Sequence, residues 1–270
     1  MNALQSRARR VSVAAAVALP LLLTLSAGCD VVTANLKHTE KAEWRKTYEL
    51  APGGRIEISN VNGKVQVEPA TGNVVEIVAE KMGRGASPES AKAALDKIEI
   101  REEASKESVK VSTRLGQASG WFGGGGSQVQ YKVRVPAGLE GRYTTVNGGV
   151  ELTRLNGRIY AEATNGGVVA REISGTLDAS TTNGGVEVDL AGVDAGGAKL
   201  RCTNGGIELR LPADAKVTVS ASITNGGIDA GSLPLEKTES TRRRLEGKLN
   251  GGGPLIRLEG TNGGISITRR

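Results

Sequence analysis

The chain has 270 residues, of which 38 are glycine and only 3% are aromatic. Its 35 basic and 29 acidic residues give a net charge of +6, too small an excess to indicate a nucleic-acid-binding protein. One histidine and two cysteines exclude a disulfide framework, a zinc site and a histidine-based catalytic triad.

Residues 1–28 have the pattern of a lipoprotein signal peptide. Three arginines precede an apolar run over residues 11–25 that is too short to span a bilayer. The stretch L-S-A-G-C ends at Cys29 and resembles a bacterial lipobox, which implies cleavage before Cys29 and attachment of membrane lipid to it. The alternative is an ordinary signal peptide with an incidental cysteine. Without residues 1–28 the chain has 32 basic and 29 acidic residues, so its net charge falls to +3.

The predicted location is therefore the bacterial cell envelope, with the protein exported and anchored to a membrane by lipid. Whether this is the inner or the outer membrane is left open. Residues 29–46 are polar and include the only histidine, His38. They are predicted to be a tether between the lipid and a folded domain over residues 47–270.

A segment at about residues 80–128 is predicted to form a small helix and antiparallel strands. Ser87 suits the N-cap of a helix over 88–97, and Pro88 suits its first position. Strands with alternating apolar residues follow the helix. Such a segment would cover strand edges that the rest of the domain leaves exposed.

The glycine-rich stretch that follows carries Trp121 and Phe122. These rings either fold back on the sheet or contact a membrane or a partner. The glycine run lacks the Lys-Ser/Thr pair of a phosphate-binding loop, so nucleotide binding is not expected.

The tripeptide Asn-Gly-Gly occurs six times in the second half of the chain. The repeats are Asn147-Gly148-Gly149, Asn165-Gly166-Gly167, Asn183-Gly184-Gly185, Asn204-Gly205-Gly206, Asn225-Gly226-Gly227 and Asn262-Gly263-Gly264. Valine or isoleucine lies three positions after each asparagine, and a further apolar residue lies two positions later. This period of two is typical of a strand with one buried face.

The apolar positions also recur about every nine residues, so that a full coil spans 18 to 21 residues. The first two intervals between the repeated asparagines are 18 residues and the next two are 21. The N-terminal part follows the same count at Ile56, Val65 and Val74.

Two folds are compatible with this repeat. Asn-Gly is a strong hairpin signal and favours an antiparallel meander or sandwich. In a meander, however, nothing would make alternate turns share one sequence, yet TNGG here alternates with LNGR, ISGT and DAGG. Identical corners once per coil are what a parallel stack requires. We predict an all-β fold, a right-handed parallel β-solenoid, with the helix and antiparallel strands packed at its N-terminal part.

In this solenoid the repeated glycines are predicted to turn the corners. Glycine adopts positive φ without steric cost, and asparagine tolerates the left-handed region better than most residues. Stacked asparagine side chains can also hydrogen-bond along the stack, as they do in cross-β assemblies.

No catalytic residue, metal site or cofactor is predicted. The outward strand positions carry a partly acidic column, which Val169 interrupts. Its members are Glu151, Glu187, Glu208 and Asp229. Stacked carboxylates could bind calcium, but Arg171 and Arg210 lie close by and favour ion pairing on a solvated face. Cys202 is predicted to be a small buried thiol.

The NGG[V/I]-x-[V/L] repeats, the stretch GGRIEISNVNGKVQVEP and the closing TNGGISI resemble a bacterial family described as a "putative adhesin" domain of unknown function. The resemblance covers residues 47–268 and implies an exported β-solenoid without catalytic residues. The leading hypothesis is a non-enzymatic lipoprotein that binds an envelope polymer or protein. The alternative is an envelope-stress sensor or regulatory accessory that docks on a membrane partner.

Overall fold

The structure is a computed structural model that describes residues 37–116, 126–231 and 233–270. These residues form seventeen strands and one helix, α1 (Pro88–Asp96). The strands are β1 (His38–Glu49), β2 (Arg55–Asn62), β3 (Val65–Pro69), β4 (Val74–Gly85), β5 (Ile98–Ala104), β6 (Ser108–Leu115), β7 (Gly126–Val135), β8 (Glu140–Asn147), β9 (Val150–Thr153), β10 (Asn156–Asn165), β11 (Val168–Asn183), β12 (Val186–Asn204), β13 (Ile207–Leu211), β14 (Val217–Asp229), β15 (Glu236–Ser240), β16 (Arg244–Leu249) and β17 (Leu255–Arg269).

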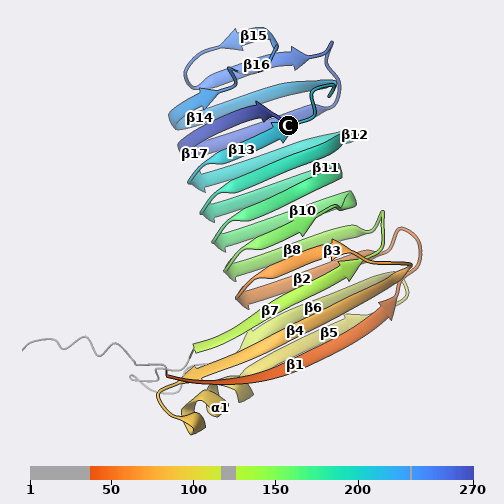
Figure 1. Cartoon of the computed structure of the whole chain (residues 1–270), viewed down its shortest axis with the longest axis vertical. Helices are drawn as coiled ribbons and strands as arrows, with labels where there is room; N and C mark the ends of the chain where they lie inside the picture. Colours follow the sequence, from red (N-terminus) through yellow and green to blue (C-terminus); the bar gives the residue numbers. More distant parts are fainter. Residues whose placement is uncertain (1–36, 117–125, 232) are drawn as a thin grey trace, which may run out of the picture. The chain divides into compact units, whose positions relative to one another are not determined.

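The repeats form a parallel β-solenoid (Figure 1). Each coil has one strand before the asparagine corner and one after it. The strands before the corner, here called the first side, pair in parallel in the order β2–β8–β10–β11–β12–β17. Those after it, the second side, pair as β3–β9–β11–β12–β13–β17. The solenoid prediction is confirmed, and the antiparallel meander is wrong for the repeats.

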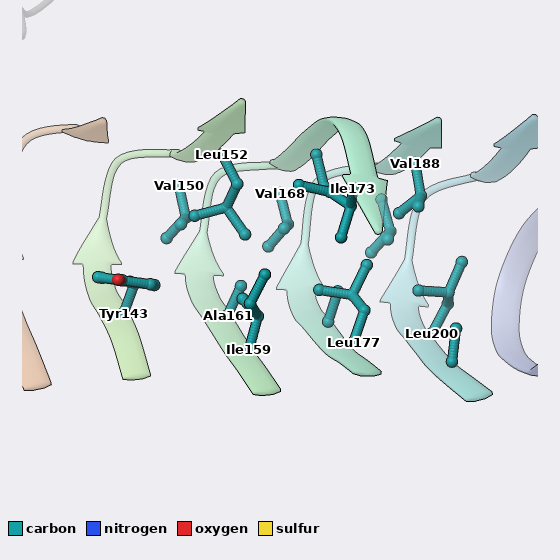
Figure 2. Packing of buried hydrophobic residues seen from close by; sticks show 14 of the residues in the cluster. Tyr143, Val150, Leu152, Ile159, Ala161, Val168, Ile173, Leu177, Val188 and Leu200 are labelled. Carbon is teal, nitrogen blue, oxygen red and sulfur yellow. The ribbon is translucent and has the colours of Figure 1, made fainter. Parts of the chain in front are cut away.

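The core is a thin column of aliphatic side chains between the two sides. Val150 lies opposite Val168, and Leu152 opposite Ala170, so like residues stack from coil to coil. Figure 2 shows Val150, Leu152 and Val168 pointing inward from successive coils, and Leu177 and Leu200 facing this column from the other side. Because large rings would not fit between every pair of strands, aliphatic residues fill most of the column.

Two tyrosines are exceptions and lie in the N-terminal coils. Tyr131 and Tyr143 are both at most 1% exposed. The hydroxyl of Tyr131 lies 2.7 Å from that of Thr113. Burial raises the pKa of Tyr131 to about 12, although the hydrogen bond with Thr113 acts against it. Burial alone raises the pKa of Tyr143 well above its ordinary value.

These tyrosines should make the protein unstable in alkali. In the unfolded chain both hydroxyls ionise near pH 10, whereas the native state keeps them protonated. Above pH 10 the unfolded state therefore binds fewer protons, and the free energy of unfolding should fall by about 1.4 kcal/mol per pH unit for each tyrosine until its native pKa is reached. Urea unfolding at pH 9 and pH 11 measures this fall. Tyr48 and Tyr160, whose pKa values are also raised by partial burial, add to this fall. Tyr131→Phe should reduce the fall between pH 10 and pH 11 by about 1.4 kcal/mol, and an unchanged slope in that variant would contradict the assignment.

The N-terminal part is covered as expected. The strands β1, β4 and β7 pair antiparallel, and β5 and β6 form an antiparallel hairpin. The helix α1 begins as predicted, because Ser87 caps it and its Oγ accepts a hydrogen bond from the Ser90 backbone N–H. Gly83 lets α1 approach β4, since a Cβ there would lie 2.2 Å from the Ala91 carbonyl oxygen.

The predicted tether over residues 29–46 is wrong for its second half. Residues from His38 onward form β1, which pairs with β4 along twelve positions. Trp44 and Tyr48 are partly buried against the core, while most of the other residues are exposed. An exposed edge strand rich in charged residues looks like a linker in sequence, although the charges here protect the edge from further pairing.

The order of the last coils also differs from the expectation. Asn225 was expected to stack on Asn204, but β17 lies between them and pairs with β12 and β13 on one edge and with β14 on the other. Residues 212–254 are therefore an insertion between two consecutive coils. They form a cap in which β14 covers β17, and β16 and β15 extend the sheet antiparallel.

The two segments that connect this cap to the solenoid, one before β14 and one after β16, lie side by side. The Asn250 side-chain amide donates to the backbone carbonyls of Ala213 and Ala215, at 3.2 and 2.9 Å. The Thr218 backbone N–H donates to the Pro254 carbonyl at 3.0 Å. The insertion thus leaves and re-enters the solenoid at one corner.

Candidate binding surface

A ladder of asparagine side chains runs along the repeated corners. Each Nδ2 donates to the Oδ1 of the asparagine in the next coil at 2.8–2.9 Å. The chain of donors runs from Asn225 through Asn262, Asn204, Asn183, Asn165 and Asn147 to Asn62. Asn62, from the stretch VNGK, was not among the six predicted repeats. The ladder satisfies each amide along the corner and fixes the register of the coils.

The two glycine positions of each corner differ in whether they can accept a residue with a side chain. The first has positive φ, such as +148° at Gly166 and +147° at Gly184. A Cβ on Gly184 would lie 2.3 Å from the Gly166 carbonyl oxygen of the neighbouring coil. A Cβ on the second glycine, Gly185, would meet its nearest atom at 3.7 Å, an ordinary contact. Only the first position therefore demands glycine, which explains how Lys64 can follow Gly63 in the corner of Asn62.

The predicted acidic column is largely neutralised by neighbouring cations. Glu151 Oε1 lies 2.7 Å from Lys64 Nζ, and Arg210 bridges Glu187 and Glu208 at 3.3 and 3.9 Å. Partial burial raises the pKa of Glu151, but the hydrogen bonds from Lys64 and Gln66 outweigh it and hold that pKa below its ordinary value.

Asp229 is separated from the rest of this column. Ser266 of β17 lies between Glu208 and Asp229, which the sequence had placed on adjacent coils. The Asp229 side chain accepts a hydrogen bond from the Gly231 backbone N–H at 3.0 Å. Within residues 37–116, 126–231 and 233–270, no group of three metal-ligating side chains comes together.

A charged hollow lies on the outward face of β1, β4, β7 and β3. It has a volume of about 570 Å³, and its lining residues are Glu43, Arg45, Gln66, Glu68, Glu76, Val78, Lys132, Val133 and Arg134. Glu76 of β4 links the two neighbouring strands, because its carboxylate oxygens lie 2.9 Å from Arg45 of β1 and 3.2 Å from Arg134 of β7.

Two groups in the charged hollow remain available to a ligand. Lys132 of β7 and Glu68 of β3 make no ion pair with any described residue, and the Lys132 side chain is exposed. An ammonium, a carboxylate and the paired arginines around Glu76 form a polar site with both signs of charge. Sequence reasoning missed it because it depends on β1 being a strand.

Cys202 is buried, as predicted. Its thiol donates to the Gly184 carbonyl at 3.2 Å, in the position where Thr181 donates to Gly166 in the preceding coil. Burial raises the pKa of the Cys202 thiol, which disfavours the reactive thiolate. This cysteine is a part of the corner rather than a nucleophile.

The predicted lipidation site and the two possible contact residues lie outside the described residues. They are Cys29, Trp121 and Phe122. The described residues on either side of the segment with Trp121 and Phe122 are joined to the sheet and the end of α1. The Gly116 backbone N–H donates to the Lys97 carbonyl, and Gly126 pairs with Arg84 of β4. Among the described residues, no helix has the length and hydrophobicity to cross a bilayer.

The chain has recognisable relatives. The solved structures that resemble it include a "putative cell adhesion protein" from Clostridium sporogenes, with a TM-score of 0.50, 13% identity and coverage of 86% of this chain and 100% of that one. A "putative adhesin" from Bacteroides fragilis matches with a TM-score of 0.29 and 9% identity, over 85% of this chain and 97% of that one. At this identity the first likeness shows a shared fold. No curated protein matches the chain.

The sequence model of the family described as Toastrack DUF4097 matches residues 55–268. This range begins at β2 and ends within β17, so it includes every coil of the asparagine ladder and the cap. The chain therefore belongs to the Toastrack DUF4097 family.

Proposed function

We propose that this protein is a non-enzymatic lipoprotein of the cell envelope that binds a polar envelope polymer or protein through the charged hollow on β1, β4, β7 and β3. Among the described residues, the carboxylates of the predicted acidic column are engaged with cations or backbone groups, and the Cys202 thiol is buried. These features support binding rather than catalysis. The names of the two structural relatives are consistent with adhesion.

The observation that carries the proposal is the charged hollow. It offers an unpaired ammonium and an unpaired carboxylate beside the pair of arginines that Glu76 holds in place. A ligand with hydroxyl, amide or charged groups can replace the water at these side chains without breaking the existing ion pairs.

Reversing the charge of Lys132 should test the hollow. Lys132→Glu is expected to weaken retention of the full chain on isolated cell-wall sacculi about tenfold, or about 1.4 kcal/mol, because the hollow then loses its unpaired ammonium and gains a second unpaired carboxylate. Lys199→Glu is the matched control, since Lys199 is an outward lysine of β12 on the first side and makes no ion pair with a described residue.

Equal retention of both variants and the wild type would contradict binding at the hollow. If sacculi retain nothing and crosslinking instead yields one membrane protein, whose yield falls with Lys132→Glu, the sensor or accessory role is the better description.

The lipid anchor is a separate part of the proposal. Cys29→Ser should abolish the attachment of fatty acid to the protein, because the thiol that would carry the lipid is gone. Labelling of cells that express the two forms with a radioactive fatty acid, followed by isolation of the protein, measures this. A variant that is labelled as strongly as the wild type would contradict lipidation at Cys29.

A further inference from the structure

The strand β1 begins only nine positions after Cys29. If Cys29 carries lipid, as the proposed function assumes, then residues 30–37 are the whole connection to the folded domain. A fully extended chain spans about 3.3–3.6 Å per residue, so the start of β1 lies within about 30 Å of the anchored cysteine. The tether expected from the sequence would have allowed about twice this distance.

The start of β1 belongs to one end of the stack, here called the α1 end. In the register of the sheet, His38 lies opposite Gly85, and Thr39 lies opposite Arg84, which in turn faces Gly126. The helix α1 packs on the same stretch, because Gly83 and Gly85 of β4 admit its backbone closely. The α1 end is therefore defined by His38, Arg84, α1 and Gly126.

Charge at this end is nearly balanced. Exposed cations are Lys37, Arg84 and Lys92, and exposed acids are Glu40, Glu89 and Asp96. A surface of this kind gains little from an anionic bilayer and is not repelled by it. The short connection, rather than attraction, would therefore hold this end at the membrane by a high effective concentration.

The opposite end of the stack lies far from this point. On the first side the strands run β5–β6–β2–β8–β10–β11–β12–β17–β14–β16–β15. Ten intervals at about 4.8 Å separate β5 from β15 by about 48 Å.

We propose that the α1 end of the domain lies against the lipid headgroup layer of the membrane that holds Cys29, and that the β15–β16 cap projects away from it. The inference rests on the lipid anchor of the proposed function. The charged hollow, on β1, β4, β7 and β3, then lies in the membrane-proximal part of the stack, where a ligand close to the bilayer can reach it.

Energy transfer to the membrane surface tests this orientation. The full lipidated chain is placed in vesicles of phosphatidylcholine and phosphatidylglycerol that contain an acceptor dye on the headgroups. A donor dye is attached at Lys92→Cys on α1 or, as the matched variant, at Lys237→Cys on β15. Both lysines are exposed, and the remaining thiol of Cys202 is buried.

Transfer from position 92 should be several-fold stronger than transfer from position 237. Insertion of a ten-residue Gly-Ser segment after Asp30 should reduce the difference, because the connection then no longer restricts the domain. Equal transfer from both positions in chains that float with the vesicles would overturn the orientation and leave the anchor intact. Chains that do not float with vesicles would overturn the anchor, and the orientation with it.

Discussion

Gly184→Val is expected to destabilise the protein by at least about 3 kcal/mol, because the corner at Gly184 combines a positive φ with close backbone packing. The φ of Gly184 is +147°, and a Cβ there would lie 2.3 Å from the Gly166 carbonyl oxygen. The adjacent coil cannot yield without breaking the hydrogen bond from the Gly166 backbone N–H to the Asn183 carbonyl. Urea unfolding measures the change.

The control for this prediction is the neighbouring glycine. Gly185→Ala should change the free energy of unfolding by less than about 1 kcal/mol, since a Cβ at Gly185 makes only ordinary contacts and its φ is not in the left-handed region. An equal loss of free energy of unfolding in both variants would contradict the different roles of the two glycines.

Leu258→Asp is expected to cost about 4 kcal/mol or more and to release the cap. Leu258 is fully buried in β17, where it lies between Leu200 of β12 and Ala221 of β14. The substitution removes the packing of a core leucine and places a carboxyl group among apolar side chains. If β17 leaves its position, β14 loses the parallel partner that its whole length requires.

Hydrogen exchange should show the loss first in the cap. The amides of β14 and β16 are expected to exchange faster in Leu258→Asp, while those of β8 and β10 keep their protection longer. Thr261→Asp places the same side chain at an exposed position of β17 and is expected to have little effect. A cap that remains protected in Leu258→Asp would contradict the placement of β17 beneath it.

The solenoid was predictable because the repeat indicates both where each corner lies and which residues of the following strand face inward. Val168, Val186 and Ile207 were expected to point inward, and all three are buried. The ladder was also predictable, since identical residues at one corner of a parallel stack must lie in register. Asn62 was missed because the search required two glycines, whereas the corner requires only the first.

The limits of the repeat were harder to recognise. The nine-residue count placed Val74 inward, but the buried residues of β4 begin with Val75 and Ile77, because this strand runs antiparallel and no longer follows the coils. The strand β1 was missed because charges hide its weak alternation at Ala42, Trp44 and Tyr48. The charged hollow depends on both strands, so its residues could not be brought together from the sequence.

The order of the final coils could not be predicted from spacing. The 21 residues between Asn204 and Asn225 match a normal coil, yet the chain forms the cap first and returns with β17 to occupy the position between them. The stretch around Asn225 has the sequence expected of the next coil. It does stack as a coil, but on the edge of β17 that lies away from β12.

The most direct test of the stacking order is crosslinking in the folded full chain. Lys199 lies opposite Arg257, and Arg257 lies opposite Ser220, all on the outward face of the first side. A short thiol-to-thiol reagent should join the pair Lys199→Cys and Arg257→Cys, whose strands are about 4.8 Å apart, and fail to join Lys199→Cys and Ser220→Cys at about twice that distance. Efficient joining of positions 199 and 220, with none between 199 and 257, would show that the coils stack in chain order and would contradict the structure.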